Sequence, residues 1–120
     1  MKCYFTAIFI FQVSLTTIKV SWKRPEHDGG SKITSYIVQV SPTLLEEWVT
    51  KVQVRESTFQ CTIAELVENS RYDVRVIAVN ALGDGEPSRP LIGVKTFDDS
   101  GKSLVLKKNS LFLLIFYFIF

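Results

Sequence analysis

The sequence contains one motif that could bind a nucleotide, Gly83-Asp84-Gly85, which follows a strand-like alternation. A phosphate-binding loop of this type needs a helix after it, because the helix N-terminus supplies amide donors and the positive end of a dipole. Pro87 and Pro90 exclude such a helix here, and Asp84 and Glu86 would repel phosphate. We therefore interpret the two glycines as turn residues, which supply positive φ angles for a tight connection between two strands.

No other residues combine into a catalytic group, which would need a positioned acid, base, nucleophile or metal. His27 is the only histidine and lies in a predicted surface loop. Cys61 would need a nearby base and partial exposure to act as a nucleophile, and its core-facing strand position denies it both. The acidic pairs Glu46-Glu47 and Glu65/Glu68 lie in predicted turns, where solvation explains them. We predict no catalytic residues, no cofactor and no enzymatic activity.

The two cysteines, Cys3 and Cys61, bear on metal binding and on the redox compartment. Together with His27 they are too few for a four-ligand zinc site, so we predict no metal. A disulfide between them remains an alternative. We favour a free thiol, because Cys61 occupies an inward strand position where a thiol serves as a small apolar residue. Without a disulfide, the cysteines do not distinguish the cytosol from the exterior.

The charge distribution argues against nucleic acid as a partner. The chain has 120 residues, a length that fits one domain, and its formal net charge is +2. Residues 13–97 carry ten basic and ten acidic side chains, so the excess positive charge comes from the ends. This stretch has no basic stripe, which is the electrostatic signature of nucleic-acid binding.

Both ends of the chain are hydrophobic, and we set them apart from the domain. Residues 1–12 form an atypical N-terminal hydrophobic segment, which has some features of a signal peptide. Residues 98–110 are expected to be a linker, and residues 111–120 a hydrophobic tail of ten apolar residues, about half of the 20 that a membrane span needs. A truncated membrane helix, a hydrophobic anchor and an artefact of a fragmentary gene model remain alternatives, so contact with a membrane stays open.

Between the ends, apolar residues recur with period two, which is typical of strands half-buried in a sheet. Turn residues separate these runs at short intervals, and this spacing favours an antiparallel sandwich or barrel. The only helix-like stretch, residues 44–49, is too short to stand alone. The alternating runs are Ile18–Trp22, Tyr36–Val40, Val52–Arg55, Phe59–Ile63, Tyr72–Ala78 and Ile92–Val94.

The outward face of the run from Tyr72 to Ala78 is the candidate partner surface. We expect Arg71, Asp73 and Arg75 to be solvated there and to form weak cross-strand ion pairs. Ile77 and Val79 share this face, and apolar side chains on it indicate a contact surface. The proposed surface residues are Arg71, Arg75, Ile77 and Val79, with the loops 26–30 and 82–86 as its polar edges.

The predicted core residues Trp22, Tyr36, Leu66 and Tyr72 carry a family resemblance. Leu66, a short polar connection and Tyr72 have the spacing of a tyrosine corner, in which the phenol bonds the nearby backbone; Tyr72 as a plain core aromatic would fit the same fold. The sequence resembles a fibronectin type III domain over about residues 13–97. The resemblance rests on Ile18-x-Val20-x-Trp22-x-x-Pro25, Asp28-Gly29-Gly30, Ile33-x-x-Tyr36-x-Val38, Leu66, Tyr72-x-Val74-Arg75-Val76-x-Ala78-x-Asn80 and Gly83-x-Gly85-x-Pro87-Ser88.

The resemblance implies an all-β, seven-stranded immunoglobulin-like sandwich, with Trp22 in the centre of the core and Tyr72 at the corner. The proline-bearing first strand of the family is atypical or missing here. Either residues 5–11 take that edge, or the border of the first sheet is uncovered. No Arg-Gly-Asp triplet follows the sixth strand, so integrin binding through that tripeptide does not carry over.

Within the family, the sequence looks most like domains of giant intracellular muscle proteins of the titin and twitchin type. This likeness implies a non-catalytic interaction and spacer module in the sarcomere, with neighbouring immunoglobulin or fibronectin type III domains and filament proteins as partners. The alternative is an ectodomain module of a cell-adhesion or signalling receptor, at the cell membrane or secreted. The stretch between the hydrophobic ends has no Asn-x-Ser/Thr glycosylation site, which favours the cytoplasm.

Overall fold

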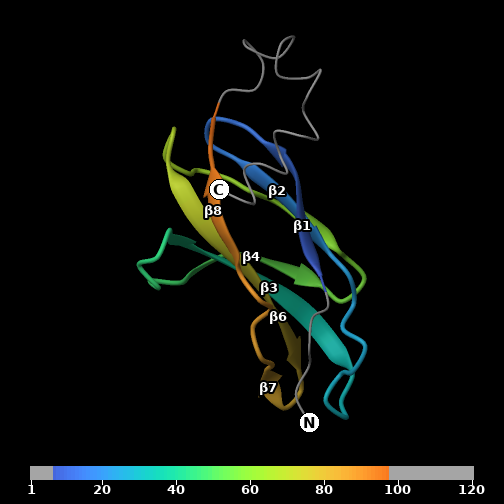
Figure 1. Ribbon diagram of the computed structural model, residues 1–120. Coiled ribbons are helices and arrows are strands. Elements are labelled where there is room, and N and C mark those ends of the chain that lie inside the picture. Colours follow the sequence, from blue (N-terminus) through green and yellow to red (C-terminus); the bar gives the residue numbers. More distant parts are fainter. Residues whose placement is uncertain (1–6, 98–120) are drawn as a thin grey trace.

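The computed structural model describes residues 7–97, which form two antiparallel sheets packed face to face (Figure 1). The first sheet has the order β1-β2-β5, and the second has the order β4-β3-β6, with β7 and β8 both paired to β6. No helix occurs within residues 7–97, so none there could cross a membrane. The strands are β1 (Ile8–Val13), β2 (Ile18–Trp22), β3 (Ile33–Pro42), β4 (Val49–Arg55), β5 (Gln60–Ile63), β6 (Arg71–Asn80), β7 (Gly83–Asp84) and β8 (Leu91–Lys95).

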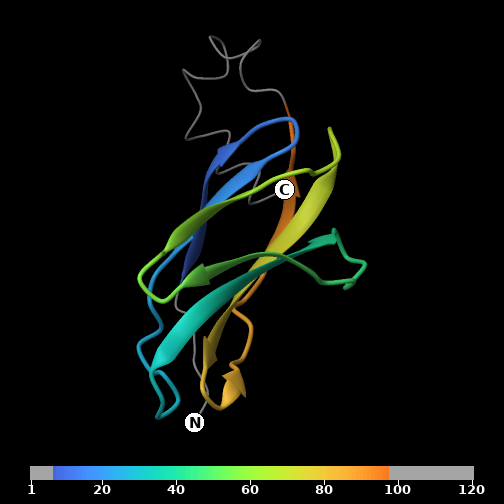
Figure 2. The ribbon, with the colours of Figure 1, turned by 180° about the vertical axis from the view of Figure 1, so that it is seen from behind.

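β7 and β8 are two parts of one interrupted edge strand. Between them, the N–H of Gly85 donates to the carbonyl of Ala78 at 2.8 Å, and the N–H of Ser88 donates to the carbonyl of Val76 at 2.8 Å. The segment from residue 83 to residue 95 therefore follows the same edge of β6 throughout. With this segment counted once, the molecule is the seven-stranded, all-β sandwich that the sequence predicted, seen from both sides in Figures 1 and 2.

The first strand lies partly inside the segment that the sequence analysis had set apart as residues 1–12. β1 pairs with β2 along the edge of the first sheet, with a bulge between Ile10 and Gln12. Its inward positions are buried, while Phe9 and Phe11 on its outer side are about half exposed, at 46% and 47%. Because both faces of β1 are apolar, its alternation is hidden in the sequence. The sandwich thus includes the residues from Ile8 onward. Cys3, the expected linker and the expected tail lie outside the described residues.

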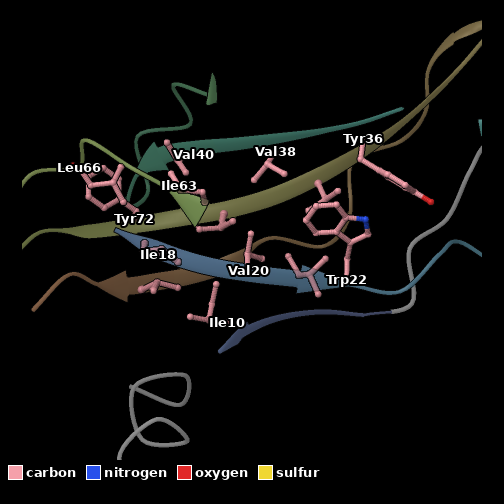
Figure 3. Packing of buried hydrophobic residues seen from close by; sticks show 14 of the residues in the cluster. Ile10, Ile18, Val20, Trp22, Tyr36, Val38, Val40, Ile63, Leu66 and Tyr72 are labelled. Atoms are coloured by element: carbon pink, nitrogen blue, oxygen red, sulfur yellow. The ribbon is translucent and has the colours of Figure 1, made fainter. Parts of the chain in front are cut away.

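The core fills the space between the two sheets (Figure 3). Trp22 and Tyr36 lie toward one end of it, with ring centroids 5.5 Å apart, and they are 3% and 0% exposed. Leu66 and Tyr72 lie toward the other end and are also buried. Burial of large aromatic and branched side chains from both sheets supplies the main favourable free energy of such a fold.

A tyrosine corner fixes the crossing from β5 in the first sheet to β6 in the second. The Tyr72 hydroxyl accepts a hydrogen bond from the N–H of Val67 at 2.9 Å. On the other side of this crossing, Thr96, which is fully buried, donates its hydroxyl to the carbonyl of Val67 at 2.7 Å. The crossing is therefore held from two strands, β6 and the end of the β8 segment.

Two connections differ in detail from the sequence expectation. Gly83 has a positive φ of 124°, as expected of a turn glycine, whereas Gly85 is not among the residues with positive φ. The helix-like stretch from residue 44 to residue 49, which was expected to be too short to stand alone, forms no helix: residues 44–48 connect β3 to β4, and Val49 begins β4. Leu44 and Glu46 have φ angles of 66° and 54°, and these left-handed conformations interrupt any helical run.

Candidate interaction surface

The residues considered for chemistry lie apart from one another. His27 is exposed in the loop after β2, and no group of three or more metal-binding side chains occurs within residues 7–97. Cys61 is a free, half-buried cysteine, and burial raises the pKa of its thiol to about 11. The thiol is therefore protonated and poorly nucleophilic at neutral pH. Glu65 and Glu68 are exposed around the tyrosine corner.

The outer face of the second sheet is defined by strand register, because residues directly opposite each other on antiparallel strands point to the same side. Arg75 lies opposite Gln39 of β3, which lies opposite Thr50 of β4. Arg71 lies opposite Lys95 of β8. This outer face comprises Thr50, Gln53 and Arg55 of β4, Ser35, Ile37, Gln39 and Ser41 of β3, Arg71, Asp73, Arg75, Ile77 and Val79 of β6, Asp84 of β7 and Lys95 of β8.

Two side-chain contacts hold Arg75 in place on this outer face. Its guanidinium carbon lies 4.2 Å from the ring centroid of Trp48, which is the geometry of a cation–π contact. Its Nε–H donates to the side-chain oxygen of Gln39 at 2.8 Å. Burial lowers the pKa of Arg75 from its usual value, although the group stays charged at all ordinary pH values. Arg75 is thus held in place rather than freely solvated, which corrects the sequence expectation.

Trp48 was not among the surface residues proposed from the sequence. It lies just before β4 and is half-buried. In the sequence, Trp48 stands out only as a tryptophan just before an alternating run. Its contact with Arg75 depends on the pairing of three strands. Only the register Thr50–Gln39–Arg75 brings Trp48 close to Arg75, and that register cannot be read from the sequence.

Asp73 was expected to be solvated, and this expectation is wrong. It is 3% exposed. One carboxylate oxygen accepts the N–H of Leu44 at 3.0 Å, and the other accepts the N–H of Gly93 at 3.0 Å. Asp73 therefore joins the β3–β4 turn and β8 to β6. Arg71 is exposed and donates Nη1–H to the carbonyl of Gly93 of β8 at 3.1 Å.

Ile77 does not present the exposed surface that its outward position suggested. It is 5% exposed, while Val79 is half-buried. Ile77 lies directly opposite Ile37, and on its other side the chain from Gly85 to Ser88 is bonded to β6. Neighbours on both sides thus cover Ile77. Of the four proposed surface residues, Arg71 is exposed, Arg75 and Val79 are half-buried, and Ile77 is buried.

The two loops proposed as polar edges are tied together at one pole of the sandwich. The Asp28 side chain accepts the N–H of Gly30 at 2.9 Å, and the Asp28 carbonyl accepts a side-chain N–H of Asn80 at 2.9 Å. Asn80 also accepts the N–H of Leu82 at 2.8 Å, and Leu82 is 81% exposed. Both loops therefore belong to one pole, next to the end of β6 that is farthest from Arg71.

Two antiparallel sheets, closed by a tyrosine corner and an interrupted last strand, define an immunoglobulin-like β-sandwich. Residues 7–94 match the family model of the fibronectin type III domain, so the chain belongs to this family. Domains of this family are in general non-catalytic structural and interaction modules. The family resemblance predicted from the sequence is confirmed.

The chain is similar to muscle proteins and to contactins. It is 41% identical over 87 residues to the titin homolog of Caenorhabditis elegans, which covers 72% of this chain and, to the nearest percent, 0% of that protein. It is 36% identical over 88 residues to human Contactin-4, which covers 70% of this chain and 8% of that protein. The crystal structure of domains A168–A170 from titin superposes with a TM-score of 0.72 at 34% identity, over 81% of this chain and 32% of that chain. The chain thus spans only a small part of the curated relatives.

Proposed function

We propose that this chain is a non-catalytic protein-interaction and spacer module of a multidomain, titin-type protein in the cytoplasm of muscle cells. The partners in this proposal are neighbouring immunoglobulin or fibronectin type III domains and filament proteins. The likeness to the titin homolog over 72% of the chain supports it. The observation that carries the spacer role is the path of the chain from one pole of the sandwich to the other.

That path follows from two hydrogen bonds at opposite ends of β1. The carbonyl of Ala7 accepts the N–H of Lys23, beside the Trp22 end of β2. The N–H of Phe97 donates to the carbonyl of Ser14, just beyond the other end of β1. Residue 7 and residue 97 therefore lie at opposite poles (Figure 1). A stretching force applied to both ends acts along β1 and β8, and it therefore loads the hydrogen bonds of these strands in shear.

Single-molecule stretching tests the spacer role. The full chain is placed between marker domains and extended from both ends. A module that transmits load should resist and then unfold in one discrete step, because the ladders of β1 and β8 must break together. Extension without a discrete step would contradict the spacer role.

A second candidate is an ectodomain module of a cell-adhesion or signalling receptor, at the membrane or secreted. Its support is the 36% identity to human Contactin-4 over 88 residues. Labelling of intact expressing cells with a membrane-impermeant amine reagent separates the candidates. We expect labelling of the chain only after permeabilisation; labelling on intact cells would favour the second candidate and contradict the first.

A further inference from the structure

β1 is an edge strand of the first sheet that lacks the usual protection of such strands (Figure 1). Native edge strands avoid pairing with another chain by carrying charged side chains or proline, or by being very short. β4 carries Lys51 and Arg55, β5 has four residues, and two prolines and Lys95 lie on the segment of β7 and β8. β1 has six residues, IFIFQV, and none of them is charged or a proline. β1 is therefore an edge that can accept another strand.

The backbone groups of Ile8 and Ile10 point to the open edge of β1. The N–H of Trp22 donates to the carbonyl of Phe59, 2.9 Å away, so the backbone of Trp22 faces β5. Ile8 lies opposite Trp22, and Ile10 lies opposite Val20, which has the same orientation two positions away on β2. Residues of such non-hydrogen-bonded pairs direct their N–H and C=O groups away from each other. Within the described part of the chain, no hydrogen bond reaches these groups of Ile8 and Ile10.

The outer side of β1 is apolar and half exposed. Phe9 and Phe11 are 46% and 47% exposed, and Phe9 lies opposite Ser21 on the outer face of the first sheet. Lys19 is the only charged residue in the three strands of this sheet, and it lies on β2, one strand away from the edge. No charged group on β1 itself would thus repel a strand that pairs there, and such a strand would cover the two phenylalanines.

A second copy of the chain fits this edge with a two-fold axis at Phe9. The bulge after Ile10 limits regular pairing to the part of β1 before it. In an antiparallel pair of two β1 strands, Ile8 of each copy lies opposite Ile10 of the other, and their N–H and C=O groups bond each other. Phe9 then lies opposite Phe9 of the second copy in a non-hydrogen-bonded pair, where side chains approach most closely. Each copy uses its one β1 edge, so the pairing closes at a dimer.

The size of this contact predicts weak association. Phe9 and Phe11 are about half exposed, and a phenylalanine side chain buries roughly 200 Å² when it is fully covered. The rings of both copies therefore contribute roughly 400 Å² of buried surface, against the ~1,200 Å² or more of a stable interface. The Lys19 residues of the two copies would be three strand spacings apart, roughly 14 Å, which exceeds the screening length of about 8 Å at physiological salt. Charge repulsion across the contact is therefore small.

We propose that the edge of β1 pairs antiparallel with β1 of a second copy of this chain, and that the resulting weak dimer is centred on Phe9. The first sheets of the two copies then form one continuous sheet, and the two Phe9 rings cover each other. The free backbone groups of Ile8 and Ile10, which match each other in this register, support it. This inference goes beyond the proposed spacer role, because the contact joins two chains side by side rather than end to end.

Sedimentation velocity of the full chain tests the dimer, and lysine variants locate it. We expect the sedimentation coefficient of the parent chain to rise toward that of a dimer at roughly 0.1–1 mM, as for a contact of this size. Phe9→Lys places two ammonium groups opposite each other and should weaken association about tenfold. Leu82→Lys adds the same charge at a residue that is 81% exposed at one pole, and it should leave association unchanged. Phe11→Lys is a second test if the amide spectrum of Phe9→Lys shows a disturbed β1.

Disulfide trapping tests the register of the pairing. Phe9→Cys is made in a chain that also carries Cys3→Ser and Cys61→Val, so that no other thiol is present. Opposed residues of a non-hydrogen-bonded pair have Cα atoms about 4.5 Å apart, a distance that a disulfide can span. We expect oxidised glutathione to convert Phe9→Cys into a covalent dimer, whereas Leu82→Cys in the same background should form far less. Equal trapping of the two variants would contradict the register.

Hydrogen exchange at the amides of Ile8 and Ile10 separates a second copy from other occupants of the edge. We expect protection that grows with protein concentration. Protection that is the same at all concentrations would place a segment of the same chain on the edge and would overturn the inference. A chain that stays monomeric at about 1 mM, or an association that Phe9→Lys leaves unchanged, would also overturn it. The stretching and cell-labelling experiments do not depend on a dimer, so a failure of this inference is distinguishable from a failure of the proposed function.

Discussion

The hydroxyl of Tyr72 on β6 accepts a hydrogen bond from the N–H of Val67, 2.9 Å away, across the crossing that joins the two sheets. The two partners are five positions apart in the sequence, so the bond closes a small ring of chain between β5 and β6. The same crossing is bonded by Thr96 from the end of the β8 segment. These contacts make the crossing a fixed part of the sandwich and give the first prediction.

Tyr72→Phe should lower the free energy of unfolding by about 1–2 kcal/mol, because it removes one acceptor and leaves the Val67 N–H without its partner. The ring itself stays in the core. Chemical denaturation of the variant and the parent protein measures the difference. A change within experimental error would show that Tyr72 acts only as a core aromatic.

Trp22→Ala should cost about 3–5 kcal/mol, since it removes a large side chain that is 3% exposed and packs on Tyr36. The midpoint of urea or guanidinium denaturation reports this loss. Phe9→Ala on the outer side of β1 is a control, because Phe9 is 46% exposed and should cost far less. Equal costs for the two variants would contradict the assignment of the core.

Asp73→Ala should lower the free energy of unfolding by about 2–4 kcal/mol, because two backbone amides lose a charged acceptor inside the protein. Hydrogen exchange at Leu44 and Gly93 should accelerate in the variant. Asp84→Ala is the matched control, since Asp84 is exposed, and it should stay within about 0.5 kcal/mol of the parent protein. An Asp73→Ala variant as stable as Asp84→Ala would mean that Asp73 is a solvated residue after all.

The thiol of Cys61 should make stability fall at high pH. Burial raises its pKa to about 11 in the folded protein, while an unfolded chain has a cysteine pKa of about 8.5. Below the lower value both states hold the proton, and the contribution to stability is fully present. As pH rises between the two values, the unfolded state releases its proton first, so the free energy of unfolding declines.

Comparison with Cys61→Val isolates this effect, because tyrosines and lysines titrate alike in both proteins. We expect the parent protein to lose stability relative to Cys61→Val as the pH rises from about 8.5 to about 11, with little change below that window. A difference that stays constant over this range would mean that the thiol is not shielded from water.

The sequence predicted those features that depend on local pattern. Alternation in β2, β3 and β6 placed Trp22 and Tyr36 inside, and the spacing from Leu66 to Tyr72 indicated the corner. Residues 8–12 of β1 were set apart from the domain, with an edge strand at residues 5–11 as one of two alternatives, because Phe9 and Phe11 make the outer side of β1 as apolar as its inner side. A period of two cannot be seen where both faces are apolar.

Features that depend on distant partners were missed or misjudged. Asp73 alternates with apolar neighbours and so resembles a solvated residue, yet its partners are amides 29 and 20 residues away. Trp48 and Gln39 hold Arg75 in position, and they contact it only when the strands are paired in the register of the folded protein. Ile77 is covered because Ile37 and the segment after Gly85 flank it, and neither contact is visible in a single strand.

Every statement about the outer face depends on the two sheets closing around Trp22. The most direct test is iodide quenching of fluorescence in a Trp48→Phe variant, in which Trp22 is the only tryptophan. We predict blue-shifted emission with little quenching by iodide, and both features should be lost on denaturation. Emission and quenching equal to those of the denatured chain would place the Trp22 indole in solvent and contradict the sandwich as described.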